Sequence, residues 1–142
     1  MGIDQALEIS VSGINANRIH MEIISSNLAN INTTRTLQGG PYRRKEPVFS
    51  EKPLEFSEAL GAAQKKLSGG IEVSEIAEDP TPFQKVFNPG HPDADSEGFV
   101  SLPNVSMSKE MVDMIYVSKL YEANITAYNA TKTMAQQALQ IQ

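Results

Sequence analysis

The closing stretch of the chain, residues 105–142, reads VSMSKEMVDMIYVSKLYEANITAYNATKTMAQQALQIQ and decides the fold. It contains neither proline nor glycine, so no residue in it interrupts a helix. Pro103 and Asn104 end whatever precedes it, and Ser106 or Ser108 can cap the first turn. At 1.5 Å per residue, a helix of roughly 30–35 residues would span about 45–52 Å. The stretch therefore predicts one long C-terminal helix.

Apolar side chains recur along this helix three and four positions apart, which is the a/d pattern of a coiled coil. The predicted seam, in which Ser118 and Lys132 are polar members, consists of Met107, Met111, Met114, Tyr121, Ile125, Tyr128, Ala135 and Leu139. A second stripe beside it comprises Val117, Leu120, Ala127, Met134, Ala138 and Ile141. A helix with one partner needs only one seam, so we expect this helix to pack against more than one neighbour.

The N-terminal stretch repeats the same pattern from residue 3 to residue 31. Its apolar seam positions are Ile3, Leu7, Ile14, Met21, Ile24, Leu28 and Ile31. Ser10 and Asn17 are the polar seam positions, of the kind that fix register. Gly13 indicates either that a partner backbone approaches closely there or that the helix is frayed or starts late. The seam is too small to hold this helix folded by itself, so we expect it to pair with the C-terminal helix or with other subunits. The helix is predicted to end near Asn30 and Asn32, because asparagine and the threonines that follow compete for backbone hydrogen bonds and the Gly39-Gly40-Pro41 turn cannot continue a helix.

The middle of the chain, residues 35–104, is predicted to be an extended, β-rich module. Short strands are expected at 47–50, 71–74, 83–87 and 98–102, and the turn-rich stretch 88–98 should join the last two as a hairpin. Residues 51–69 form an insert in this module, and the helical spacing over 54–67, interrupted by Gly61, predicts either a weak helix or a mobile segment. The predicted fold class is mainly α with a small inserted β module, in which terminal segments 1–34 and 105–142 form a coiled-coil-like pair.

Composition excludes several classes of function. The net charge of −5 lacks the basic excess of a nucleic-acid-binding protein, and the absence of cysteine excludes disulfides and thiolate metal sites. No apolar run reaches membrane-spanning length, and the N-terminus lacks the basic and apolar regions of a cleavable secretory signal. We therefore expect neither a nucleic-acid partner nor a membrane span.

The one stretch that imitates a metal site is Asp93-Ala94-Asp95-Ser96-Glu97-Gly98. It matches the first half of an EF-hand loop, but the twelfth position is Asn104 rather than a bidentate glutamate. His20 is expected on a helix surface and His91 in a turn, without the spacing that would join them at one metal. No phosphate-binding or nucleophile motif is present. The sequence predicts no enzyme activity, no cofactor, no metal and no small-molecule substrate.

A basic cluster, Arg43-Arg44-Lys45, follows the glycine turn. Most such runs are solvated faces, and the acidic total of the chain argues against phosphate or nucleic acid as its partner. If the cluster has a binding function, we expect it to meet carboxylates of another subunit.

Several motifs in order resemble the bacterial flagellar rod and hook family, and within it the proximal rod subunits. They cover nearly the whole chain except 51–69, and they are SNLANINT (26–33), GGPYRRK (39–45), PGHPDAD (89–95), LPNV (102–105), EMVDMI (110–115) and YEANITA (121–127). The resemblance implies a structural, non-catalytic subunit of the basal-body rod, the shaft that transmits motor torque across the periplasm and encloses the export channel.

The resemblance also implies partners and location. The chain would assemble with copies of itself and with other flagellar rod proteins, including the rod–export junction protein, and its helix seams would form the assembly interface. It would leave the cytoplasm through the flagellar type III export apparatus, without a cleavable signal peptide, and function in motility as an oligomeric assembly. The alternative interpretation of the residues is a soluble coiled-coil adaptor or chaperone with a weak metal site in the 93–98 loop.

Overall fold

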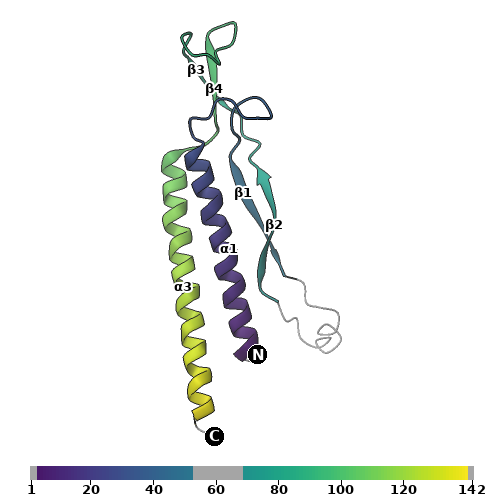
Figure 1. The fold of residues 1–142 in the computed structure, drawn as a ribbon, viewed down its shortest axis with the longest axis vertical. Helices are drawn as coiled ribbons and strands as arrows, with labels where there is room; N and C mark the ends of the chain where they lie inside the picture. Colours follow the sequence, from purple (N-terminus) through teal and green to yellow (C-terminus); the bar gives the residue numbers. More distant parts are fainter. Residues whose placement is uncertain (1–2, 53–68, 141–142) are drawn as a thin grey trace.

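A computed structural model describes residues 3–52 and 69–140 of the chain. The elements are α1 (Ile3–Ala29), β1 (Lys45–Glu51), β2 (Ile71–Glu78), β3 (Gln84–Phe87), β4 (Phe99–Leu102) and α3 (Met107–Gln140). Two long helices with small antiparallel hairpins between them confirm the predicted fold class (Figure 1). The insert segment at 54–67 and the last member of the second stripe, Ile141, lie outside the described residues.

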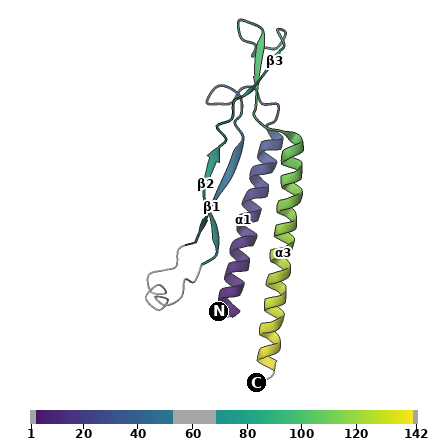
Figure 2. The same cartoon turned by 180° about the vertical axis from the view of Figure 1, so that it is seen from behind.

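The two helices run antiparallel and side by side along the long axis of the molecule (Figures 1 and 2). Helix α1 ends at Ala29, followed by a turn in which the N–H of Asn30 donates to the carbonyl of Ser26 at 3.1 Å. The helix therefore ends where the cluster of asparagines and threonines was predicted to stop it. Helix α3 extends past the start of α1, so its last turns have no helical partner among residues 3–52 and 69–140 (Figure 1).

The face of α3 that packs on α1 follows a strict heptad pattern. We call it the inner seam, and every member is buried or half-buried: Glu110, Met114, Val117, Tyr121, Asn124, Tyr128, Thr131 and Ala135. Four of these positions were predicted, but the other four lie one residue before Met111, Ser118, Ile125 and Lys132. Met107, Met111 and Leu139 are instead 54%, 54% and 75% exposed. The observed contact face is thus rotated by part of a turn from the predicted one.

The rotation has a physical cause at each end of the seam. Near its start the fully buried Glu110 takes the place expected for Met111, because Arg44 and Asn27 supply hydrogen bonds to its carboxylate. Further along, Asn124 lies over Gly13, where a Cβ would stand only 2.8 Å from the amide nitrogen of Asn124. Gly13 therefore lies inside a continuous helix at a site of close approach, which was one of the two alternatives, but a side chain and not the expected backbone approaches it.

The second stripe predicted on α3 also changes. Val117, assigned to that stripe, is fully buried in the inner seam. Leu120, Ala127, Met134 and Ala138 are exposed.

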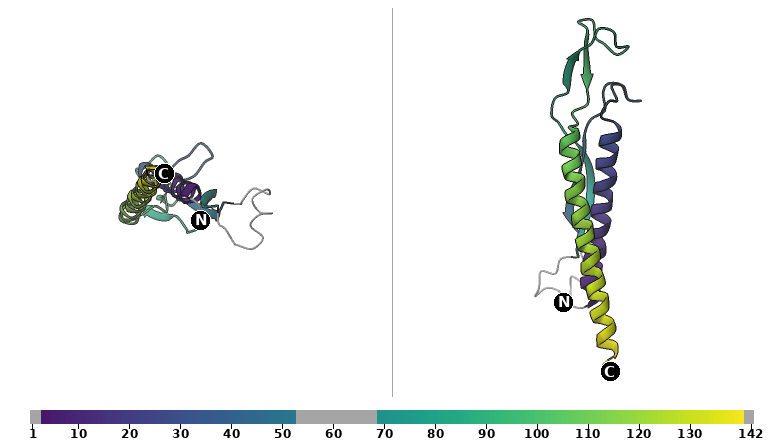
Figure 3. Two further views of the ribbon diagram at one scale, coloured as in Figure 1. Left: turned by 90° about the horizontal axis from the view of Figure 1, so that it is seen from below. Right: turned by 90° about the vertical axis from the view of Figure 1, so that its left-hand side faces the viewer.

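Helix α1 is the middle layer of the molecule, between α3 and the β1–β2 hairpin (Figures 1 and 3). Contacts on both sides explain why its buried residues do not form a single seam: they are Ser10, Ala16, Ile23, Ile24 and Asn27. Of the apolar positions of the predicted N-terminal seam only Ile24 is fully buried, while Ile3 is 41% exposed and the others are half-buried. The Ser12 hydroxyl accepts a hydrogen bond from the N–H of Ile71 at 3.1 Å and so fixes the start of β2 against α1.

The hairpins agree with the predicted strands and extend two of them. Strand β1 pairs with β2 from Lys45↔Glu78 to Glu51↔Ile71, with a register shift between Val48 and Phe49. Strand β3 pairs with β4, and the 88–98 loop joins them as predicted. This second hairpin projects beyond the helix pair (Figures 1 and 2), and the rings of Phe87 and Phe99 meet edge-to-face at 5.4 Å. No helix of the described residues is long and apolar enough to cross a membrane.

Candidate functional site

A buried polar cluster joins the end of α1, the start of β1 and the first turn of α3. Arg44 is 5% exposed and Glu110 is fully buried, and the Nε of Arg44 donates to the Glu110 carboxylate at 2.5 Å. The same guanidinium forms ion pairs with Glu46, with Asp79 at 3.8 Å and with Asp113 at 3.5 Å. A buried charge without a partner would cost a large amount of free energy, and the pairing of the Arg44 cation with carboxylates offsets that cost.

Asn27 connects this cluster to α1. Its side chain is fully buried and donates from Nδ2 to Glu110 at 3.0 Å and to the carbonyl of Lys45 at 2.9 Å. Its Oδ1 accepts from the N–H of Lys45 and from the hydroxyl of Tyr42, each at 3.0 Å. Every hydrogen-bonding capacity of the amide is therefore used, and one residue links three segments that are far apart in sequence.

Asn104 and Asp79 extend the connection to the base of the second hairpin. Asn104 accepts from the N–H of Arg44 at 2.8 Å and donates to the carbonyl of Asp79 at 3.1 Å. Hydrogen bonds from the hydroxyl and the N–H of Thr81 lower the pKa of the Asp79 carboxyl, and the charge of Arg44 acts in the same direction. Asp79 therefore stays ionised where it faces Arg44.

His20 lies half-buried on α1, where its ring meets that of Phe49 on β1 at 5.7 Å. Burial lowers the pKa of His20, the charges of Asp113 and Glu110 oppose that effect, and the charge of Arg44 adds to it. The prediction of a helix-surface histidine is therefore only partly right, because the ring is covered by the first hairpin. His91 lies in a turn, as predicted, and accepts from the N–H of Asp93 at 3.1 Å.

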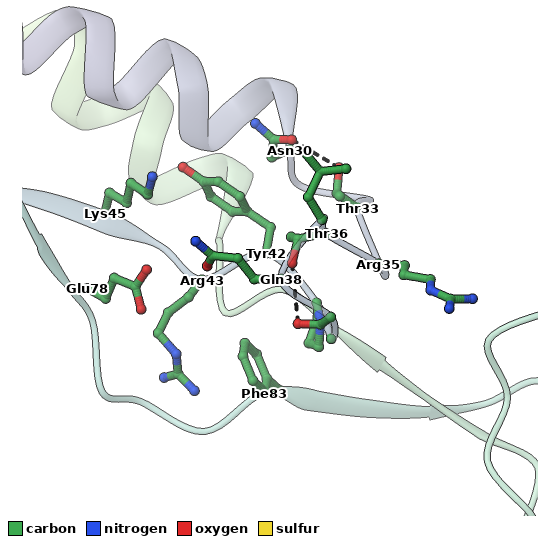
Figure 4. Close-up of a pocket in the computed structure, with 14 residues that line it drawn as sticks. Asn30, Thr33, Arg35, Thr36, Gln38, Tyr42, Arg43, Lys45, Glu78 and Phe83 are labelled. Carbon is green, nitrogen blue, oxygen red and sulfur yellow. Dashed lines mark hydrogen bonds between the residues drawn. The ribbon is translucent and has the colours of Figure 1, made fainter.

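The basic cluster at 43–45 contacts its own chain at every member. Arg43 donates to the carbonyls of Asp79 at 2.8 Å and Thr81 at 3.2 Å and lies 4.3 Å over the ring of Phe83. Together with Lys45 it lines a groove of about 910 Å³ beside the 33–42 loop (Figure 4). Arg44, in contrast, is buried and has no surface to offer another subunit. The cluster thus consists of one structural cation and two that border a groove.

One flank of α3, roughly 100° around the helix from the inner seam, carries a second heptad of apolar residues. We call it the outer stripe, and all of its members are exposed: Val112, Tyr116, Leu120, Ala123, Ala127, Ala130 and Met134. From Tyr116 onward the spacing alternates four and three, as in a coiled-coil interface. Tyr116 and Met134 are 64% and 65% exposed, which is unusual for large apolar side chains that repeat along one face. The outer stripe therefore combines exposure with the spacing of a coiled-coil seam.

The 93–98 loop uses its carboxylates within the chain. Asp95 Oδ1 accepts from the N–H groups of Glu97 at 3.0 Å and Phe99 at 2.8 Å, and Asp93 accepts from the hydroxyl of Thr34 at 2.8 Å. Among the described residues, no three histidine, aspartate or glutamate side chains are grouped so that they could hold a metal ion. The loop is thus built as a turn, which is the alternative use of the same residue types.

Both terminal segments match models of flagellar rod proteins. Residues 7–35 match the family "Flagella basal body rod protein", and residues 96–141 match "Flagellar basal body rod FlgEFG protein C-terminal". The chain is 43% identical to the flagellar basal-body rod protein FlgC of Bacillus subtilis, over 96% of this chain and 95% of that protein. It belongs to the FlgC family. The FlgC proteins of Aquifex aeolicus and Borreliella burgdorferi are 41% and 36% identical, over 93% and 99% of this chain and 91% and 98% of those proteins.

Membership in the FlgC family makes this chain a structural subunit of the proximal rod of the flagellar basal body, and not an enzyme. The polar cluster connects the two stretches that the rod models match, since Asn27 lies in the first and Glu110 in the second. Sequence reasoning missed Asn27, Tyr42 and Glu110 as partners. Neither Asn27 nor Glu110 occupies a predicted seam position, so the one local signal was that each is a polar residue inside a recognised motif, SNLANINT for Asn27 and EMVDMI for Glu110.

Proposed function

We propose that this FlgC-family chain assembles into the rod by packing the outer stripe of α3 against helices of neighbouring subunits. The observation that supports this is the exposed apolar heptad on a flank of α3, roughly 100° around the helix from the face that packs on α1. Burying such a stripe contributes about 25 cal/mol for each Å² removed from water, so a long helical contact would resist twisting. This gives the rod its capacity to transmit torque around the export channel.

The other predicted interface residues fall into two groups in this proposal. Met107, Met111 and Leu139 are exposed and join the contacts between subunits, as does Ile3 at the free end of α1. The half-buried members mainly hold the helix pair together within one subunit, and they are Leu7, Ile14, Met21, Leu28, Ile31, Met114, Tyr121, Ile125, Tyr128 and Ala135, with the fully buried Ile24. The terminal segments 1–34 and 105–142 thus act as one assembly domain, with 35–104 outside it.

The neighbours in this proposal are copies of this chain, other flagellar rod proteins and the rod–export junction protein. Arg43 and Lys45, on the wall of the 910 Å³ groove, meet carboxylates of one such neighbour. Lys45→Glu should then reduce swimming, and unchanged swimming would contradict that contact. The chain reaches the periplasm through the flagellar type III export apparatus, so inactivating that apparatus should retain it in the cytoplasm.

A charge on the outer stripe tests the assembly proposal. Ala127→Glu should abolish swimming in a strain that lacks its own copy of this subunit, because the carboxylate would be buried without a partner between subunits. Asn129→Glu is the matched control, since it places the same charge two residues away on a different exposed face. Isolated basal bodies should contain the control variant and lack Ala127→Glu. Equal incorporation of the two variants would refute the proposed interface.

A further inference from the structure

The loop between α1 and β1 exposes one large apolar side chain on a backbone that is held by hydrogen bonds within the loop. Leu37 is fully exposed, with a relative exposure of 109%. The loop is closed by hydrogen bonds from the N–H of Thr36 to the carbonyl of Gly40 at 2.8 Å, from Gly39 to Thr36 at 3.0 Å and from Tyr42 to Thr33 at 3.0 Å. Because the backbone is fixed in this way, little further ordering is needed when the leucine is buried.

Two glycines allow this loop to project. Gly39 and Gly40 have φ values of +88° and +76°, in the left-handed region that other residues rarely adopt, and nothing lies within 4 Å of a Cβ built on either. The tip is therefore surrounded by open space. Arg35, whose side chain is 79% exposed, adds a positive charge two residues before the leucine, and its guanidinium lies 3.9 Å from the Asp93 carboxylate of its own chain, so it would have to face both that carboxylate and a partner. The loop thus presents one apolar group beside one cation.

A groove of about 540 Å³ lies at the other end of α1, between its N-terminal half and β2. Leu7, Val11 and Ile71 contribute apolar walls, and Val11 and Ile71 are 41% and 38% exposed. Glu8 and Glu72 carry negative charge at this groove and Lys52 carries one positive charge, so the balance is negative. Its apolar lining and its charge complement those of the Leu37 loop.

The loop of one molecule cannot fill the groove of the same molecule. Val11 lies near the start of α1 and the loop follows its end, so about 18 residues at 1.5 Å each separate them by roughly 27 Å. In Figure 1 the loop that follows α1 lies at one end of this helix, and the N-terminus of the helix lies at the other. A projection and a recess at different places on one surface make a head-to-tail contact, which propagates into an open array instead of closing as a dimer.

We propose that Leu37 of one copy inserts into the groove lined by Leu7, Val11 and Ile71 of a second copy, with Arg35 facing Glu8 and Glu72. This deepens the proposed function, on which it rests, by assigning an axial contact that does not use the outer stripe. It gives the loop after α1 a role in fixing the offset between successive copies.

Disulfide crosslinking in isolated basal bodies tests this contact, because the chain contains no cysteine of its own. The variant carrying both Leu37→Cys and Val11→Cys should form disulfide-linked multimers of this chain under mild oxidation, since the two Cβ atoms would come within about 4 Å. The matched control carries Leu37→Cys with Lys119→Cys, a position exposed on α3. The proposal would be overturned if the double variant is incorporated into basal bodies but forms no more disulfide-linked multimers than the control. Crosslinks of Leu37→Cys only to itself or to another rod protein would also overturn it.

A second pair of variants does not depend on disulfide geometry. Leu37→Asp should lower the amount of this chain in basal bodies about tenfold or more, because a buried leucine contributes at least that factor to an association constant. Arg35→Glu should lower it as well, and adding Glu72→Arg should restore it. Full incorporation of Leu37→Asp would overturn the contact while leaving the outer stripe intact. Failure of the unaltered chain to incorporate would instead refute the proposed function.

Discussion

Removing Arg44 should destabilise the chain more than removing the charge of Glu110, although the two side chains are bonded to each other. Without Glu110, Arg44 keeps ion pairs to Glu46, Asp79 and Asp113. Without Arg44, the fully buried Glu110 keeps only the amide of Asn27. An uncompensated buried charge costs about 3–5 kcal/mol, whereas one lost charged hydrogen bond costs about 1.5–3 kcal/mol.

Urea unfolding followed by circular dichroism measures both changes. We expect Arg44→Ala to lower the free energy of unfolding by about 3–5 kcal/mol and Glu110→Gln by about 1.5–3 kcal/mol. Glu122→Gln is the matched control on the same helix, because its ion pair with Lys119 is exposed and should contribute about 0–1 kcal/mol. The reasoning is refuted if Glu110→Gln destabilises no more than Glu122→Gln, or if the order of Arg44→Ala and Glu110→Gln is reversed.

Three further predictions concern packing and pH. Gly13→Ala should be destabilising alone and become stabilising by up to about 1 kcal/mol in an Asn124→Ala background, because the alanine then has space and favours the helix; equal effects in both backgrounds would contradict the close approach. Since burial holds the pKa of His20 below 6.5, the unfolded chain binds that proton more tightly, and the free energy of unfolding should fall as the pH decreases below 6.5. Denaturation at several pH values should show a smaller fall for His20→Gln, and identical profiles would count against this. Gly98→Ala should destabilise the second hairpin by about 1–2 kcal/mol, because φ is +81° and a Cβ would stand 2.9 Å from the ring of Phe87; unchanged hydrogen exchange across β3 and β4 would argue otherwise.

The sequence predicted the elements well and the contact face of α3 only in part. The repeat period of apolar residues and the positions of glycines are local properties of the sequence. The helices, the hairpin loop and the end of α1 could therefore be located from them. The rotation of the inner seam depends on long-range partners of Glu110 that no local pattern shows. Hydrophobicity alone predicts that Met111 is buried and Glu110 exposed. The hydrogen bonds from the buried side chains of Arg44 and Asn27 to Glu110 reverse that order.

The same limit applies to the candidate interface. Heptad spacing showed that α3 carries more apolar surface than one partner needs, yet it placed Val117 outside and Met111 inside. Once Glu110, Asn124 and Thr131 are fixed in the inner seam, the outer stripe is left exposed on a flank roughly 100° around the helix. The basic cluster shows a similar division, because burial separates Arg44 from its sequence neighbours Arg43 and Lys45. Three adjacent cations therefore have different surroundings, which their sequence order alone does not reveal.

The most direct test of the account is the accessibility of the outer stripe in the assembled rod. With no native cysteine in the chain, Ala127→Cys can be labelled with a maleimide in the purified subunit and in intact basal bodies. We predict rapid labelling in the free subunit, where residue 127 is exposed, and strong protection after assembly. Labelling of incorporated Ala127→Cys as fast as in the free subunit would contradict the claim that this face holds the subunits together.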